Sequence, residues 1–353
     1  MNPQWLAFLK QQNAQIENNQ VIRFGDIAAE RQAAVTQTVL CDLSHLGFIA
    51  AEGEEAQSFL QNQLSNDVTK VTEQLSQLNA YCTAKGRALA LLRLFNTNNR
   101  FLIQLPVDRI EPILKRLQMF VLRSKVTLQN VSDQWIAFGI AGPKAQQLLS
   151  AIQTDLPEQD NHCTVSNHMV ICKIQGTQPR YMIISDAQTA IDTWSKLSPS
   201  AVQCSHNIWS HLDIMAGVPQ IYEANVEAFV PQMMNLHSID GISFNKGCYP
   251  GQEIVARMHY LGKLKRRMYL THVDAQQPAP RAGDLIFAAN DQSKEGIGRV
   301  VDAQPSPKGG FDLLSVLQIA SVDSGSARLF SADGPALDIH DLPYKVILER
   351  ENP

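Results

Sequence analysis

A turn rich in glycine and proline constrains this chain more than any other feature of its sequence. Within residues 241–257, the segment Ile242-Ser-Phe244 is typical of a short strand, and two glycines and Pro250 interrupt the chain after it. Apolar residues then recur at helical spacing, at Ile254, Val255, Met258 and Leu261. The sequence therefore predicts a strand, a tight turn and a helix that begins close to Gly251.

The same turn carries the residues best suited to chemistry. Cys248 lies just ahead of the predicted helix N-terminus, where unpaired backbone N–H groups lower the pKa of a thiol. Lys246 adds a positive charge two residues earlier, and Glu253 can cap the helix. Gly247 and Gly251 permit positive φ or a close backbone approach to a ligand. This pattern predicts a reactive cysteine; the alternative is an ordinary tight turn with a small residue at position 248.

Along the rest of the chain, the apolar periodicity changes more than once. Residues 54–133 predict an α+β unit, with helices at 54–64 and from Asp108, and strands at 78–83, 88–95, 101–105 and 125–128. Strands and capped helices alternate from residue 135 onward. After Lys265, β-rich runs predict a small antiparallel barrel or sandwich, at 268–273, 285–288, 298–301, 313–319 and 327–330. A chain of 353 residues accommodates two or three domains, at roughly 100–200 residues each.

Composition narrows the functional classes. Hydrophobic residues make up 44% of the chain and charged residues 18%, which is typical of a globular protein and excludes disorder over its whole length. The net charge of −4 argues against a protein that mainly wraps nucleic acid. No run approaches the ~20 apolar residues that cross a bilayer, and the apolar N-terminal run is not typical of a signal peptide. We therefore expect a cytoplasmic protein without a membrane partner.

The six cysteines, at positions 41, 82, 163, 172, 204 and 248, show no CxxC spacing and no cysteine–histidine cluster. In a chain of this length without an export signal, we expect reduced thiols, most of them buried. No bound metal is predicted. No histidine is fixed close to Cys248 as a base, so a hydrolytic Cys/His site has little support.

Three further features have both an ordinary and a functional interpretation. Trp209 lies on the apolar face of a predicted helix, where it either belongs to the core or forms an aromatic shelf for a flat ligand. Two basic segments are typical of a solvated hairpin tip and of a linker, and either could contact phosphates instead. They are Lys85-Gly86-Arg87 and the run Lys263, Lys265, Arg266 and Arg267.

The octapeptide Lys246-Gly-Cys-Tyr-Pro-Gly-Gln-Glu253 resembles the K-G-C-Y-x-G-Q-E signature of the YgfZ family, whose members are relatives of the glycine-cleavage aminomethyltransferase. The resemblance covers residues 40–345, with further matches at 59–63, 67–68, 82–86, 92–95, 229–232, 235–236, 241–244 and 342–344. It implies an α+β fold: a three-domain cloverleaf of the aminomethyltransferase type. The first domain would be split over 1–53 and 134–255 around a ferredoxin-like domain at 54–133, and a β-barrel at 256–353 would follow.

The resemblance also implies roles for single residues. Cys248 would be the reactive group beside Lys246, in a signature loop completed by Gly247, Tyr249, Gly251, Gln252, Glu253 and Arg257. A folate, tetrahydrofolate or another form, would lie against Trp209. Leu46 stands where bacterial relatives carry a second tryptophan, and Met215 stands where a glutamate holds the pterin. Iron–sulfur enzymes or assembly proteins would be the protein partners.

These residues lead to one expected function and two rivals. We expect a folate-binding-type protein that maintains or assembles iron–sulfur clusters and thereby supports tRNA modification. The first rival is a folate-dependent one-carbon transferase, but Ala90 and Leu91 replace the acidic pair of aminomethyltransferases. That replacement removes the carboxylate needed to handle the folate nitrogen. The second rival is a module that binds tRNA directly through the basic segments at 85–87 and 263–267.

Overall fold

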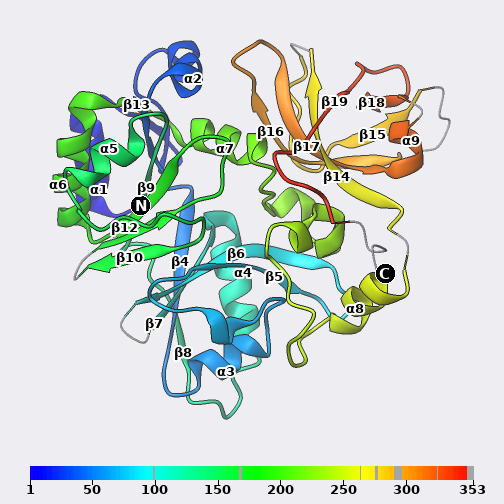
Figure 1. The fold of residues 1–353 in the computed structure, drawn as a ribbon, viewed down its shortest axis with the longest axis horizontal. Helices are drawn as coiled ribbons and strands as arrows, with labels where there is room; N and C mark the ends of the chain where they lie inside the picture. The colour runs from blue at the N-terminus through cyan, green and yellow to red at the C-terminus, as the bar shows by residue number, and fades with distance from the viewer. Residues whose placement is uncertain are drawn as a thin grey trace. The chain divides into compact units, whose positions relative to one another are not determined.

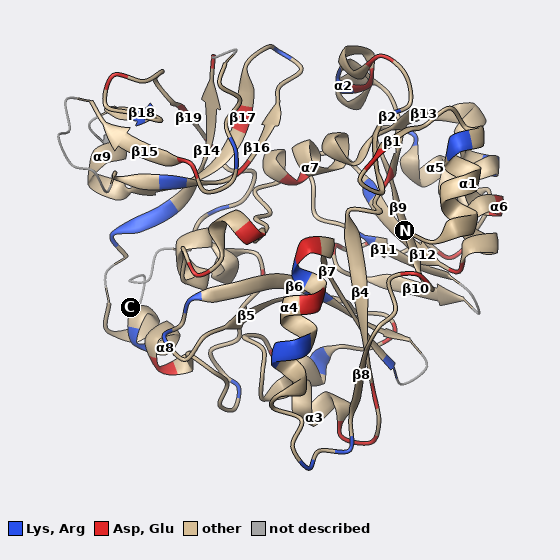
Figure 2. Cartoon of the chain, turned by 180° about the vertical axis from the view of Figure 1, so that it is seen from behind, with Lys and Arg blue, Asp and Glu red and all other residues tan. Residues whose placement is uncertain are grey.

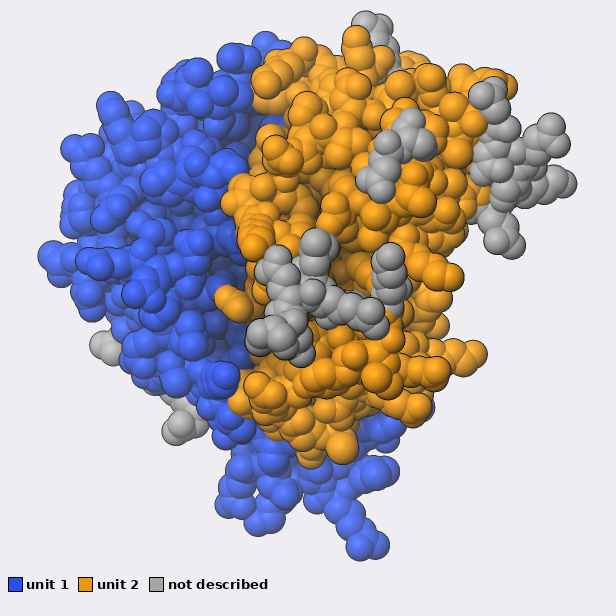
Figure 3. All heavy atoms as spheres, turned by 45° about the vertical axis from the view of Figure 1, so that its right-hand side comes forward, with its two compact units in different colours: residues 1–59, 69–77, 93–212 blue, residues 60–68, 78–92, 213–353 orange. Residues whose placement is uncertain are grey.

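The computed structural model describes residues 1–97, 100–166, 169–262, 264–274, 277–289, 296–323 and 325–347. The chain folds into two compact units (Figure 3). Unit 1 consists of Met1–Phe59, Thr69–Gln77 and Arg93–Leu212, and unit 2 consists of Leu60–Val68, Leu78–Leu92 and Asp213–Pro353. Each unit therefore combines segments that are far apart in the sequence.

Unit 1 contains a six-stranded sheet in the order β10-β11-β12-β9-β3-β13 (Figure 1). Its strands are β3 (Val39–Asp42), β9 (Ile136–Ala141), β10 (Cys163–Ser166), β11 (Met169–Lys173), β12 (Arg180–Ser185) and β13 (Val202–Cys204). β13 runs parallel to β3, and the other pairings are antiparallel. β3, β9 and β12 are buried along their whole length because both faces of the sheet are covered.

Alternate residues of β3 point into two different cores of unit 1, as the period of a strand requires. Leu40 joins a cluster formed with α1 (Pro3–Gln11), α5 (Ala145–Ser150) and α6 (Ala187–Leu197). In that cluster the rings of Trp5 and Trp194 are 5.4 Å apart. Val39 and Cys41 join the opposite cluster, with residues of α2 (Ile27–Thr36) and α7 (His206–Met215). A short hairpin, β1 (Gln15–Glu17) and β2 (Gln20–Arg23), follows α1.

A five-stranded antiparallel sheet has the order β5-β6-β7-β4-β8. Its strands are β4 (Leu46–Glu52), β5 (Gln77–Cys82), β6 (Ala88–Thr97), β7 (Arg100–Pro106) and β8 (Thr127–Asn130), with α3 (Ala56–Gln61) and α4 (Val107–Gln118). The predicted helices and strands of this region are therefore present. β4 precedes the predicted boundary at residue 53 and pairs with β7 and β8. The limits of the three domains stay a prediction.

The C-terminal part of unit 2 is a six-stranded antiparallel sheet in the order β18-β15-β16-β17-β14-β19, which curls in Figure 1. The strands are β14 (Arg266–Val273), β15 (Leu285–Ala288), β16 (Gly298–Pro305), β17 (Phe311–Gln318), β18 (Ala327–Leu329) and β19 (Asp338–His340), with α9 (Ile319–Asp323). The β-rich runs predicted after Lys265 are thereby confirmed. One face buries Met268 and Leu314, and the other buries Tyr269 and Leu313.

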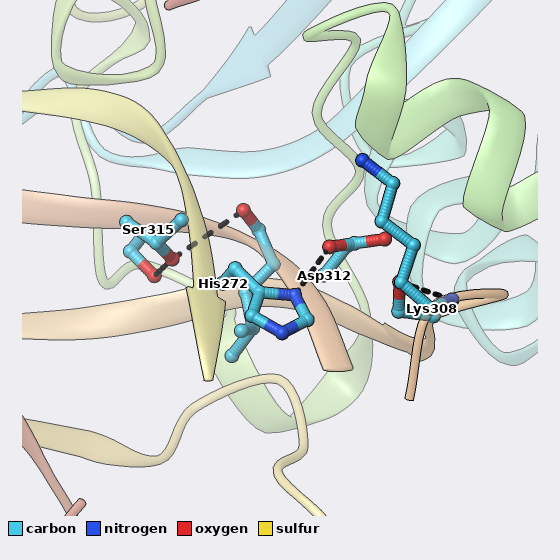
Figure 4. A network of polar contacts seen from close by, with 7 residues as sticks. His272, Lys308, Asp312 and Ser315 are labelled. Carbon is cyan, nitrogen blue, oxygen red and sulfur yellow. Dashed lines mark hydrogen bonds and ion pairs between the residues drawn. The ribbon is translucent and has the colours of Figure 1, made fainter. Parts of the chain in front are cut away.

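One end of this sheet is polar. His272 Nδ1 lies 2.7 Å from Asp312 Oδ1, and the hydroxyls of Thr271 and Ser315 are 2.9 Å apart (Figure 4). His272 and Asp312 stand directly opposite each other on β14 and β17, so the pair reinforces the strand register. No group of three or more His, Cys, Asp and Glu side chains among the described residues is arranged to hold a metal ion. None of the helices in the described residues is long and apolar enough to cross a membrane.

Asp302 on β16 is a buried carboxyl group, 8% exposed. The Tyr222 hydroxyl donates to it at 3.0 Å and the Ala303 N–H at 2.8 Å. Burial nevertheless raises the pKa of Asp302 from its ordinary 3.8 to about 7, and the charge of Asp213 adds to the rise. The fold therefore holds this carboxyl group in a place that favours its neutral form.

The raised pKa of Asp302 predicts a pH dependence of stability. Between about pH 4 and pH 7 the folded state binds more protons than the unfolded state, so the free energy of unfolding should fall as pH rises through this window. Asp302→Asn should remove this fall. At pH 8 the variant should be more stable than the wild type by on the order of 2–4 kcal/mol, with little difference near pH 4. Urea unfolding at both pH values measures it, and parallel pH profiles for the two proteins would contradict it.

Candidate functional site

The signature loop lies between the 3₁₀ turn at Leu236–Ser238 and α8 (Gln252–Tyr260). The predicted helix is confirmed, with Gly251 as its N-cap. The predicted strand at 242–244 is wrong: these residues pair with no strand. Instead the Ser243 N–H donates to Ser65 O at 3.1 Å, and Ile242 packs into the core of unit 2. A single backbone hydrogen bond to a loop takes the place of a strand ladder.

Gly251 is needed for two geometric reasons. Its φ is +83°, which side-chain-bearing residues rarely adopt. A Cβ there would also collide with Thr83 O and lie 2.7 Å from Gly86 Cα. The Lys85–Arg87 hairpin tip therefore packs directly against the signature loop. Gly247 differs, because its φ is not positive and a Cβ there would meet nothing within 4 Å.

Lys246 fixes the start of the loop. Its ammonium donates to Gln61 O at 2.7 Å, Leu64 O at 2.6 Å and Asn66 O at 2.7 Å. It also lies 5.1 Å from the centre of the Tyr249 ring. Burial lowers the pKa of Lys246 to about 8, although the nearby Asp67 carboxylate favours the charged form.

This geometry changes the role expected for Lys246. An ammonium group has three N–H donors, and all three are used by carbonyls of the 61–66 segment. None remains to hydrogen-bond the Cys248 thiolate. Lys246 therefore anchors the loop.

Ser65 and Asn66, which were not predicted as site residues, brace the same segment. The Ser65 hydroxyl donates to Gly241 O at 2.9 Å and accepts from the Ala80 N–H at 2.8 Å. The Asn66 amide donates to Asp240 O at 2.6 Å. Both side chains are buried, at 0% and 8% exposure. In the sequence, the run of short polar residues directly after an apolar helix could have indicated this bracing role.

Cys248 is exposed, whereas the other five cysteines are buried. Next to it, Tyr249 is 7% exposed, and burial raises the pKa of its hydroxyl. The Gln252 amide donates to Lys246 O at 3.4 Å and closes the turn. Glu253 and Arg257 are exposed, and no side chain caps α8, so the predicted capping role of Glu253 is wrong. The loop thus presents one thiol outward from a fixed backbone.

Comparison with known proteins identifies the family. The family model described as the GCVT N-terminal domain matches residues 5–184. A Colwellia psychrerythraea (strain 34H) protein named tRNA-modifying protein YgfZ is 32% identical over 318 residues, covering 90% of this chain and 96% of the relative. The chain belongs to the YgfZ family. The resemblance carried by the 246–253 signature is thereby confirmed.

A solved structure confirms the fold class of this YgfZ family member. The glycine cleavage system aminomethyltransferase T from Bartonella henselae is similar with a TM-score of 0.77, at 15% identity, over 97% of each chain. At that identity the likeness concerns the fold alone. The chain therefore has the mixed α+β fold of the aminomethyltransferase type.

The residues that the YgfZ resemblance assigns to folate are buried or half-buried. Trp209 is 1% exposed, and a Cβ on Gly139 would collide with its ring. The Arg180 guanidinium lies 5.1 Å from the ring centre. Trp209 is therefore a core residue here, not an open shelf. Leu46 and Met215 are half-buried apolar side chains that offer a pterin no hydrogen bond.

The remaining predicted residues fall into two groups. Ala90 and Leu91 are both 0% exposed in β6, so no carboxylate stands there. Among the basic residues, Lys85 and Lys265 are exposed (Figure 2 shows the start of β14 in blue). Arg87 donates to Ala228 O at 3.0 Å, and Arg267 lies 4.8 Å from the ring centre of Tyr269. Arg266 lines a cavity of about 120 Å³, and Lys263 lies outside the described residues.

The anchoring role of Lys246 predicts a stability effect. Lys246→Met removes three hydrogen bonds from a charged donor and should lower the free energy of unfolding by about 2–4 kcal/mol. Lys246→Arg should not restore it, because a planar guanidinium cannot direct donors to three converging carbonyls. The matched control is Cys248→Ser in the same loop, which should change stability by less than about 0.5 kcal/mol. Urea unfolding measures the free energy of unfolding. A Lys246→Met protein of unchanged stability whose Cys248 thiol reacts more slowly would mean that Lys246 acts on Cys248 directly.

Proposed function

We propose that this chain supports tRNA modification by maintaining or assembling iron–sulfur clusters, with Cys248 as the reactive group. The observation that carries the proposal is the exposed Cys248 thiol on a loop that the fold holds at both ends. The Colwellia relative is named for tRNA modification, and the similarity to it extends over nearly the whole chain. Both support a role for this site.

The loop geometry suits a thiol that meets a large partner. Lys246 and Gly251 tie the backbone to neighbouring segments, so little conformational freedom is lost when a partner binds. A Cβ added at Gly247 would meet no described atom within 4 Å, so the space beside Cys248 is open. A thiolate there can attack a disulfide or bind iron. Because clusters usually take four thiolates, a cluster held here would need ligands from the partner.

One-carbon transfer is disfavoured by β6. The positions of the acidic pair are Ala90 and Leu91, both fully buried, and Leu91 belongs to the hydrophobic core of unit 2. No carboxylate there can handle a folate nitrogen. Direct tRNA binding is disfavoured by the state of the basic residues, since Arg87 and Arg267 already make internal contacts. Folate remains the ligand class that the family suggests, and no step of the proposal passes through it.

The proposal predicts that Cys248 is the thiol that matters. Near pH 7, iodoacetamide should label Cys248 at least about tenfold faster than any other cysteine, because the other five are buried. Cys248→Ala should fold normally but fail to support tRNA modification in cells. The control is Asn245→Ala, an exposed neighbour in the same loop, which should retain function.

Two cellular readouts separate the parts of this proposal: modified nucleosides in tRNA and the activity of an iron–sulfur enzyme that does not act on tRNA. Both should fall in the Cys248→Ala strain. Loss of tRNA modification alone would overturn the iron–sulfur part. Full function of the alanine variant would overturn the role of the thiol.

The folate positions predict a gain of affinity. Met215→Glu restores a carboxylate that can accept two hydrogen bonds from a pterin, which is worth ~2–3 kcal/mol. Isothermal titration with tetrahydrofolate should show weak binding to the wild type and binding tighter by roughly 30- to 150-fold in the variant. Met215→Gln, which lacks the charge, is the matched control. No heat from either protein, under conditions where a known folate binder responds, would exclude folate as the ligand.

A further inference from the structure

Two cysteines of unit 1 stand directly opposite each other on neighbouring strands. Cys163 on β10 pairs in register with Cys172 on β11. The Cys163 N–H donates to Gln74 O at 2.8 Å, away from β11, so this is a pair without backbone hydrogen bonds between its members. Such antiparallel pairs have Cα atoms about 4.5 Å apart. A disulfide needs roughly 4.4–6.8 Å, so the backbone already permits the bond.

A buried guanidinium lies beside this pair. Arg93 is 8% exposed and donates to Asn161 Oδ1 at 2.6 Å and to Ser76 Oγ at 3.1 Å. Ser76 Oγ is in turn 3.2 Å from Cys172 Sγ. Among the described residues, no carboxylate forms an ion pair with Arg93. A buried cation is stabilised by an anion, and the Cys172 thiol, at the end of this chain of contacts, can become one.

The two thiols differ in acidity. Burial alone would raise the pKa of Cys172, and the Asp160 carboxylate acts in the same direction. The Cys163 thiol, Arg93 and Ser76 outweigh both, so the pKa of Cys172 lies below its ordinary value. The neighbouring Cys172 thiol, together with burial, raises the pKa of Cys163. Cys172 therefore takes the thiolate role and Cys163 the role of proton donor.

We propose that Cys163 and Cys172 form a redox-active pair that reduces a hydroperoxide and closes into a cross-strand disulfide. The Cys172 thiolate attacks one peroxide oxygen, the O–O bond breaks, and the hydroxide that leaves takes up the proton that the Cys172 thiol released when it ionised. The product is a sulfenic acid on Cys172. The Cys163 sulfur then attacks the Cys172 sulfur, the S–O bond breaks, and the Cys163 proton leaves with the hydroxyl as water. Two thiols and one hydrogen peroxide give one disulfide and two waters, and a dithiol reductant restores the thiols.

The location of the pair selects for a small oxidant. Cys172 is 0% exposed and Cys163 is 6% exposed, so a bulky reagent has no approach in the folded state. β10 is the edge strand of its sheet and is only four residues long, and on its outer side the backbone of Cys163 is bonded, among the described residues, only to the loop residue Gln74. Edge strands open locally at lower free energy than central strands, and hydrogen peroxide is hardly larger than water. This separates the pair from Cys248, which is open to large reagents.

The same unit contains a matched control. Cys41 on β3 and Cys204 on β13 are also buried and directly opposite each other. Their surroundings carry the opposite charge: burial, the Cys204 thiol and the carboxylates of Glu30 and Asp42 all raise the pKa of Cys41. Two thiols in contact without a cation should resist oxidation.

The experiment uses the full chain with Cys248→Ser, which prevents disulfides between molecules. The folded protein is treated with one equivalent of hydrogen peroxide, alkylated after denaturation and cleaved with cyanogen bromide. Cleavage after Met169 separates the two cysteines, so only a disulfide holds the two fragments together. We expect Cys163 and Cys172 to be linked and Cys41 and Cys204 to be alkylated.

Two variants test the assigned roles. Arg93→Met should slow disulfide formation at least tenfold, whereas Arg93→Lys, which keeps the charge, should retain most of the rate. Cys163→Ser should stop the reaction at a Cys172 sulfenic acid, which dimedone traps when the oxidised protein is denatured in its presence, and this result does not require Arg93→Met to fold. Equal oxidation of both cysteine pairs, an unchanged rate in Arg93→Met, or no linkage in the folded protein would each overturn the proposal.

Discussion

An ammonium group bound by three backbone carbonyls is the contact on which the candidate site depends. Lys246 satisfies every one of its N–H donors with Gln61, Leu64 and Asn66. Burying a charge is costly, and three charge-assisted hydrogen bonds offset that cost. No other side chain offers three donors arranged around one charged atom, so the position accepts lysine alone. The ammonium group therefore holds the backbone of the loop in place.

The rest of the loop follows from that anchor. Asn66 and Ser65 hold the chain just before the loop through carbonyls at 240 and 241, and Gly251 seats its end on the 83–86 turn. Between these points Cys248 makes no hydrogen bond to a described residue and is exposed. The interactions of the site thus fix the position of the loop, and the thiol itself is left unconstrained for a partner. That arrangement is typical of a group whose chemistry is completed from outside.

Local sequence patterns predicted many of the helices and strands, whereas contacts between residues far apart in the sequence could not be predicted. α8 and β15 follow from apolar periodicity and turn residues within a few positions, so their prediction needed no partner. The carbonyls that bind Lys246 lie 185, 182 and 180 residues away in the chain, and no spacing rule reaches so far. The wrong strand at 242–244 has the same cause, because an extended segment becomes a strand only where a free sheet edge meets it. Trp209 is a further example. Its position on a helix was predictable from the sequence, but whether its ring faces a cavity or packs on Gly139 depends on the sheet that contains Gly139.

The cysteines show how one side chain acquires different chemistry from its surroundings. Cys248 is exposed and has no hydrogen-bond donor beside it among the described residues. Cys172 is buried and has the Arg93 guanidinium nearby, whereas Cys41 is buried and has no described cation that lowers its pKa. Exposure decides which reagents arrive, and charge decides what fraction of the thiol is ionised when they do. A macromolecular partner can therefore select Cys248, while a small neutral oxidant is governed by the cation beside Cys172. Exposure and neighbouring charge are independent properties of a thiol. One chain can therefore keep the exposed thiol for a partner and the buried thiol pair for an oxidant, without either reaction consuming the other's sulfur.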